Sequence, residues 1–154
     1  MPAKAKAPSA KRAPLARSLT YRLHLLHKIT DLVSQQRYEE QLGMSLSDGR
    51  CLATIGAFGP LSVGELAEHS NLNKSQASRG AQTLVDLGQV AKVDHPEDGR
   101  GVLLELTPAG RRQWARSMDV IEQRNKDIFG CLSAAEQAAL SGVFDRLIEH
   151  NRRD

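Results

Sequence analysis

The sequence predicts a mainly α-helical protein that carries one small β-hairpin. Helix starts recur along the chain, each marked by a Ser, Thr or Asn that is followed three residues later by an acid or an amide. Between Gly88 and Thr107 the pattern changes to two short apolar segments around a Pro/Asp/Gly turn, which indicates a hairpin. The first and last predicted helices also carry apolar faces that are too broad for lone surface helices.

The first predicted helix runs from about Leu15 to Leu42 and has two apolar stripes. Leu25 and Leu32 mark the second stripe, and the first consists of Leu19, Leu23, Leu26, Ile29 and Val33. Three shorter helices should follow, separated by Gly59-Pro60 and stopped by Gly88. Their starts are Ser45 with Asp48, Ser62 with Glu65 and Asn73 with Gln76.

The predicted strands cover about Val90 to Asp94 and Val102 to Leu106. Pro108 after Thr107 starts the next helix, because the missing N–H of proline is not needed at the first helical position. Ser133 with Glu136 starts the last helix, from about Ala134 to Arg152. Its apolar face consists of Ala139, Val143, Phe144, Leu147 and Ile148. Because such terminal helices would leave apolar surface exposed, we expect a dimer; a helical bundle within one chain is the alternative.

Composition narrows the class of protein. The chain has 154 residues, a formal charge of +3 and a pI near 9.1, so it holds one domain of ordinary size and tolerates anionic partners. Residues 1–15 form a basic stretch without apolar periodicity, which predicts a disordered tail, either solvated or in contact with phosphates. No signal peptide or membrane span is evident, and the two cysteines lie far apart, so we expect a cytoplasmic protein.

Helix, turn, helix and hairpin in this order is the arrangement of a winged helix-turn-helix. In the helix from Lys74 to Leu87, Ala77, Ala81, Leu84 and Val85 recur at helical spacing and should face the core. The opposite face has no acid between Glu68 and Asp86, which favours contact with DNA; a solvated polar face is the alternative. The predicted contacts of this helix are Asn73, Lys74, Ser75, Gln76, Ser78, Arg79 and Thr83.

The predicted hairpin supplies the wing. Arg100 lies near its tip, where a guanidinium suits a narrow minor groove, and Asp98 is placed to hold it. Lys92 and His95 are candidate phosphate contacts, although each of these residues also suits an ordinary surface turn.

From about residue 15 onward the chain resembles the MarR family of bacterial transcription regulators. The likeness is carried by "LGMSLSDGRCL", by "PLSVGELAEHSNLNKSQASRGAQTLVDLGQV", by "DHPEDGRGVLLELTPAGR" and by the two closing helices. The most specific part is Asp98 to Gly110, although Gly99 and Gly101 flank Arg100 where many relatives carry a bulkier residue after the arginine. The resemblance implies a homodimer whose first, fifth and sixth helices interlock and whose recognition helices bind a pseudo-palindromic operator, with repression as the default.

We therefore expect a winged helix-turn-helix lobe over residues 45–107, with dimerisation helices in residues 16–44 and 108–154. Family members commonly bind small aromatic acids, phenols or related compounds between these two regions. Here the candidate ligand residues are Arg22, His24, His27 and Arg50, which suit a carboxylate or an aromatic acyl thioester. Equally, the two histidines suit an apolar interface, and Arg50 suits a DNA phosphate. No cofactor is expected.

Several rival functions remain at this point. The chain lacks a nucleophile elbow, a phosphate loop and a dinucleotide fingerprint, so we expect no enzymatic activity. An architectural DNA-binding protein without an effector, a redox- or metal-responsive regulator of the same fold, and a protein-interaction module are the alternatives. His24 and His27 are spaced to share a metal, but no matching set of ligands follows them.

Overall fold

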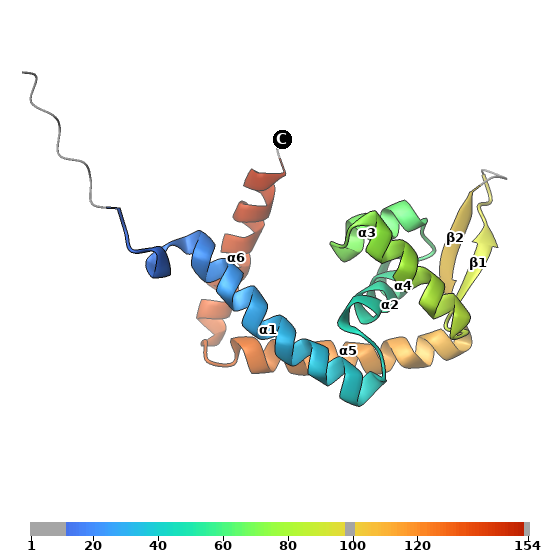
Figure 1. Cartoon of the computed structure of the whole chain (residues 1–154), viewed down its shortest axis with the longest axis horizontal. Helices are drawn as coiled ribbons and strands as arrows, with labels where there is room; N and C mark the ends of the chain where they lie inside the picture. Colours follow the sequence, from blue (N-terminus) through green and yellow to red (C-terminus); the bar gives the residue numbers. More distant parts are fainter. Residues whose placement is uncertain (1–11, 98–100, 153–154) are drawn as a thin grey trace, which may run out of the picture.

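The computed structural model describes residues 12–97 and 101–152, and it confirms the mainly helical class with a two-stranded hairpin (Figure 1). Its elements in chain order are a 3-10 turn η1 (Leu15–Arg17), α1 (Leu19–Leu42), α2 (Leu46–Phe58), α3 (Val63–Ser70), α4 (Lys74–Asp86), β1 (Val90–Asp94), β2 (Val102–Leu106), α5 (Pro108–Phe129) and α6 (Ala134–Asn151). The strands pair antiparallel, with Val90 opposite Leu106 and Asp94 opposite Val102.

The predicted helix starts are present as hydrogen-bonded caps. Ser62, Asn73 and Ser133 each form a complete capping box with the residue three positions later. The predicted start of the first helix at Leu15 is wrong, because the Ser18 side chain accepts a hydrogen bond from the backbone N–H of Tyr21 and so begins α1 at Leu19. Residues 15–17 form the separate turn η1.

Helices α2, α3 and α4 pack with the hairpin into one lobe. Its centre is apolar, and Leu52, Leu66, Leu84 and Leu104 are fully buried there. Leu61 adds a one-residue third strand, since its N–H and C=O both exchange hydrogen bonds with Leu104. Sequence reasoning missed this bridge, because a single paired residue leaves no periodic pattern.

Close packing of α4 on α2 depends on Gly80. A Cβ atom at this position would lie 2.6 Å from the Cys51 sulfur, which is closer than real Cβ contacts allow. A glycine on this helix permits close approach either to a groove or to a neighbouring helix. The structure shows the second of these, because the buried side of α4 rests on α2.

Helix α5 joins the lobe to the rest of the chain. Near its start, the indole N–H of Trp114 donates to the Ala53 carbonyl of α2 at 3.2 Å. Further along, the buried Arg124 guanidinium donates to the Ser34 hydroxyl at 3.1 Å and to the Thr30 carbonyl at 3.3 Å, which fastens α5 to α1. Helix α5 thereby connects the lobe, through α2, with α1.

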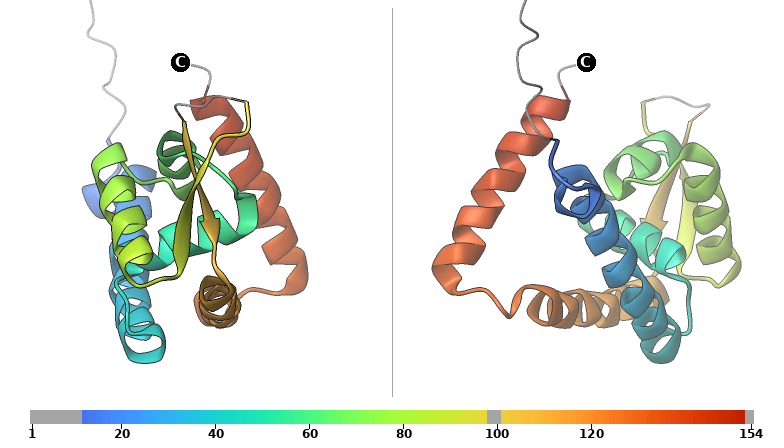
Figure 2. Two further views of the ribbon diagram at one scale, coloured as in Figure 1. Left: turned by 90° about the vertical axis from the view of Figure 1, so that its right-hand side faces the viewer. Right: turned by 60° about the vertical axis from the view of Figure 1, so that its left-hand side comes forward.

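Helix α6 stands away from the lobe after a turn at the end of α5 (Figure 2). No residue of this fully described helix is buried, and Phe144, Leu147 and Ile148 are each at least two-fifths exposed. The apolar stripe of α1 is exposed as well, with Leu19 at 79%. The alternative of a bundle within one chain is wrong for this structure, because α6 covers no apolar face of α1.

Candidate nucleic-acid interface and effector cavity

The two faces of α4 differ as the sequence predicted. Ala77, Ala81 and Leu84 are buried in the lobe, and Val85 packs against the same core. On the other side, the exposed residues are Asn73, Lys74, Ser75, Ser78 and Arg79. Burial of the apolar side fixes the rotation of the helix, so the polar side faces solvent.

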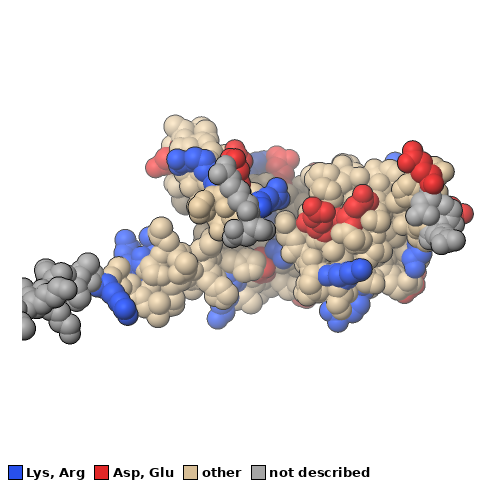
Figure 3. Space-filling model, turned by 90° about the horizontal axis from the view of Figure 1, so that it is seen from above, with Lys and Arg blue, Asp and Glu red and all other residues tan. Residues whose placement is uncertain are grey.

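Gln82 extends this exposed face, and sequence reasoning missed it. Its side-chain N–H donates to an Asp86 carboxylate oxygen at 2.8 Å, and its carbonyl oxygen accepts from the Lys92 ammonium of β1 at 3.1 Å. The wing and α4 are thus tied together by one side chain. Seen from above, blue Lys and Arg side chains lie along the lower edge of the lobe in the picture, while red acids lie at its middle and at its upper right edge (Figure 3).

Two predicted contacts of α4 are only half-exposed. The Gln76 side chain accepts from the Asn73 backbone N–H at 3.2 Å, while the Asn73 side chain accepts from the Gln76 N–H at 2.8 Å. The Thr83 hydroxyl donates to the Arg79 carbonyl at 3.0 Å. These bonds hold the start and middle of α4 and leave Gln76 and Thr83 half-exposed, so their contact with DNA stays a prediction.

The described part of the wing ends just before its tip. Lys92 is exposed on β1, and the backbone N–H of His95 donates to Gly101 at 2.9 Å, which closes the hairpin. The His95 ring accepts from the Glu97 N–H at 3.1 Å. Asp98 and Arg100 lie outside the described residues, so their positions stay predictions.

Three of the four predicted ligand residues meet at one cavity of about 520 Å³, which we call the α1–α2 cavity. His24 and His27 reach it from α1 and Arg50 from α2, whereas Arg22 is exposed and does not line it. The cavity is completed by Lys28, Asp31, Leu32, Gln35, Leu46, Ser47, Leu72 and Gln76. Because Gln76 also caps α4, this cavity borders the start of the helix with the polar face.

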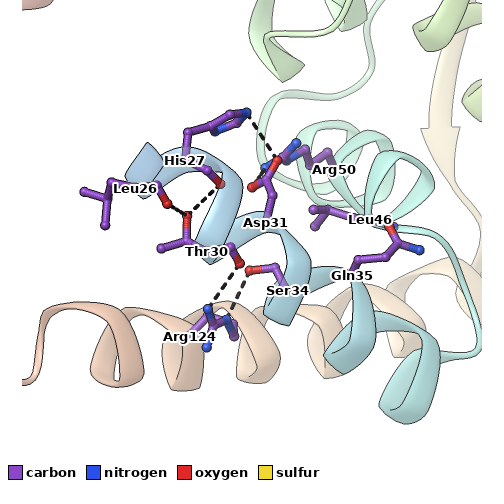
Figure 4. Close-up of polar contacts among 9 residues, drawn as sticks. All are labelled: Leu26, His27, Thr30, Asp31, Ser34, Gln35, Leu46, Arg50 and Arg124. Carbon is purple, nitrogen blue, oxygen red and sulfur yellow. Dashed lines mark hydrogen bonds and ion pairs between the residues drawn. The ribbon is translucent and has the colours of Figure 1, made fainter. Parts of the chain in front are cut away.

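Asp31 of α1 contacts two potential cations of the cavity, one on each of its two helices. An Arg50 guanidinium nitrogen lies 2.9 Å from one Asp31 carboxylate oxygen, and the His27 Nε2 atom lies 3.4 Å from the other oxygen (Figure 4). Sequence reasoning missed Asp31, because its pairing with Arg50 spans nineteen positions and two helices.

A second cavity of about 310 Å³ lies on the other side of Arg50, between α1, α2, α3 and α5. Tyr38, His69 and Arg124 are among its polar lining residues. Burial raises the pKa of the Tyr38 hydroxyl, and the nearby Arg50 charge opposes this rise. Arg124 also lies 3.3 Å from Asp127. Ser117, Val120 and Arg124 recur at helical spacing on one side of α5. This spacing could have shown from the sequence that the arginine faces inward.

Redox and metal chemistry find little support in the described residues. Burial and the neighbouring Asp48 raise the pKa of the Cys51 thiol to about 12, which opposes formation of the reactive thiolate. Cys131 is exposed and unpaired with Cys51. Residues 12–97 and 101–152 contain no group of three potential metal ligands, and His27 is engaged by Asp31.

The geometry defines a winged helix-turn-helix lobe carried on long helical arms. Residues 42–101 match the model of the MarR family. The helix-turn-helix transcriptional regulator YdgJ of Bacillus subtilis is 26% identical over 129 residues, which cover 84% of this chain and 76% of that protein.

Solved structures share the whole arrangement. A MarR/EmrR family regulator from Acinetobacter sp. ADP1 superposes with a TM-score of 0.83 at 20% identity, covering 92% of this chain and all of that one. BpsR of Bordetella bronchiseptica, whose DNA binding is regulated by 6-hydroxynicotinic acid, gives 0.79 at 19% identity, covering 88% and 96%.

These matches show that the chain has the winged helix-turn-helix fold of the MarR regulators, and that residues 42–101 are similar to this family. Among the described residues, no helix is long and apolar enough to cross a membrane.

Proposed function

We propose that the protein is a homodimeric repressor that binds a pseudo-palindromic operator and is released by a small aromatic effector. The observation that carries this proposal is the outer face of α4, which is polar and basic beside the wing while its inner face is locked in the core. Such a helix suits the major groove, where Arg and Lys reach guanine edges and phosphates.

The homodimer is supported by the uncovered arms. Leu19, Leu23 and Leu26 on α1 and Leu147 and Ile148 on α6 are all about half or more exposed. Apolar surface of this kind stabilises a protein when it is removed from water, and a second copy presents matching faces under two-fold symmetry.

The proposed DNA contacts are divided between helix and wing. Lys74, Ser75, Ser78 and Arg79 offer exposed donors on α4, and Asn73, Gln76 and Thr83 border them. Lys92 and His95 extend the surface along the hairpin towards Asp98 and Arg100. In this proposal the helix recognises base edges, while the wing binds phosphates and the minor groove.

The effector is proposed to bind in the α1–α2 cavity. Three cationic or titratable side chains, His24, His27 and Arg50, together with Leu32 and Leu72 suit an aromatic carboxylic acid, a phenol or an aromatic acyl thioester. The acid that regulates DNA binding by BpsR is also a small aromatic one. Arg22 does not line this cavity and is not part of the proposed site.

The effector acts through the spacing of the two recognition helices. Two-fold binding to one face of B-DNA needs them about 34 Å apart, or a multiple of this. An effector that prefers a dimer with another spacing lowers the DNA-competent population, and reversing a 1:99 ratio to 99:1 takes about 5.5 kcal/mol of differential binding.

A competition experiment tests the DNA-binding part of this proposal. A duplex enriched by the protein from a random pool is competed at fixed salt against its scrambled version. We expect an inverted repeat and a preference of about a thousandfold or more. Equal affinity for both duplexes would instead favour the architectural DNA-binding protein, which needs no effector.

A further inference from the structure

The α1–α2 cavity has an uneven charge inventory. His24, His27, Lys28 and Arg50 supply the potential positive charges, whereas Asp31 is the single acid among the described residues that line it. A cavity of this composition attracts anions, and its strongest permanent charge is the Arg50 guanidinium. Whatever neutralises Arg50 therefore decides how strongly an external anion binds.

The Asp31 carboxylate already neutralises the Arg50 guanidinium. One carboxylate oxygen contacts Arg50 of α2 and the other contacts His27 of α1, so both oxygens face cationic partners in the way a bound carboxylic acid would (Figure 4). The Asp31 and Arg50 side chains are 30% and 38% exposed. A pair so accessible to water is weak enough to exchange with a dissolved anion.

On the basis of the effector role proposed above, we propose that Asp31 is a built-in competitor of the effector anion for Arg50. The Asp31 carboxylate occupies Arg50 in the empty protein and an effector carboxylate takes its place. Asp31 thereby lowers the affinity of the cavity for all anions, so a ligand must supply further contacts, such as ring packing on Leu32 and Leu72, to bind.

Replacement of Asp31 by an effector anion at Arg50 also affects the contact between α1 and the lobe. The Asp31–Arg50 contact connects α1, which belongs to the arms, with α2 of the lobe, and its loss removes one bond between them. The same cavity borders Gln76, which caps α4. An anion that replaces Asp31 is thus placed to loosen the attachment of the lobe near the start of the recognition helix.

The test is titration of the full-length protein with sodium salicylate by isothermal calorimetry. Asp31→Asn removes the charge but keeps the shape of the side chain. We expect the dissociation constant of this variant for salicylate to be about two- to fivefold lower. This is the effect expected when one half-exposed ion pair no longer competes. Salicylamide, which has no carboxylate, should bind both proteins equally.

Three further variants complete the design. Asp31→Glu keeps the competing charge and should bind salicylate more weakly than Asp31→Asn. Glu40→Gln removes one acid from an exposed position of the same helix and should leave the wild-type constant unchanged. Asp31→Ser, a second neutral variant, should reproduce the tighter binding if the asparagine protein unfolds.

Equal or weaker salicylate binding by both neutral variants would overturn the competitor role, as would no binding by either of them. An equal gain in Glu40→Gln would also overturn it, because the effect would then be general charge repulsion. Preference for the selected duplex is measured separately, without salicylate. Its loss would count against the proposed function, whereas its persistence with a negative titration would count only against Asp31.

Discussion

The lobe and the arms of this protein expose opposite kinds of side chain to water. In the lobe, α4 hides its apolar side, with Leu84 fully buried, and exposes polar groups. In the arms, α6 buries nothing and exposes Phe144, Leu147 and Ile148. The difference teaches that the lobe covers its own apolar core, whereas the arms leave apolar surface for the second copy proposed above. A substitution should therefore act on folding in one region and on association in the other.

The largest effect is expected in the arms. Leu147→Asp places a charge in the apolar stripe of α6, and a buried unpaired charge at an interface is not tolerated. We expect the dimer to dissociate in the micromolar range, as measured by multi-angle light scattering. Ala138→Asp adds the same charge at an exposed position on the opposite side of the same helix and should leave the mass unchanged. Loss of the dimer in both variants would remove the stripe from the interface.

The next effect concerns the core of the lobe. Leu84→Ala leaves a cavity beneath α4 and should lower the free energy of unfolding by about 2–5 kcal/mol. Leu87, three residues later, is 57% exposed, so Leu87→Ala should cost no more than about 0.5 kcal/mol. Urea unfolding of both variants measures the difference. Similar losses would contradict the assignment of the buried side of α4.

Substitutions on the outer face of α4 should change DNA binding and leave the free energy of unfolding unchanged. Arg79→Ala is expected to weaken binding to the selected duplex by about 1–3 kcal/mol and to relax base preference at one position. Arg112→Ala removes the same charge from an exposed site on α5 and serves as the control. Fluorescence anisotropy with matched and mismatched duplexes separates the two. An unchanged base preference would exclude Arg79 from sequence recognition.

The smallest effect concerns a cap in the lobe. Ser62→Ala removes the acceptor for the Glu65 backbone N–H and should lower the free energy of unfolding by about 1 kcal/mol. Ser62→Gly keeps the backbone conformation available and should cost only about a few tenths of a kcal/mol. Thermal unfolding at one protein concentration measures both. A larger loss for glycine than for alanine would mean that the side-chain bond is unimportant.

The sequence predicted those features that depend on neighbours in the chain. Helix caps join residues three positions apart, so Ser45, Ser62, Asn73 and Ser133 were found with their helices. The hairpin strands also followed from local alternation and turn residues. The start of α1 was the exception, because a Leu-rich pattern extended past the Ser18 cap.

Features that depend on crossing helices were not predictable in the same way. Arg50 was selected as a ligand residue, but Asp31 and Arg124 on either side of it come from α1 and α5, whose packing brings them together. The bridge of Leu61 to Leu104 and the contact of Gln82 with Lys92 likewise join separate elements. Their geometry follows from tertiary packing, about which residue spacing says little.

The central claim is that two copies of this chain present two recognition helices to one duplex. Sedimentation velocity of the protein with a labelled, selected duplex, at ratios that include duplex in excess, tests it most directly. The account predicts complexes of two chains per duplex at every ratio, each chain contributing 16.9 kDa. A complex with one chain per duplex and full sequence preference would contradict the account.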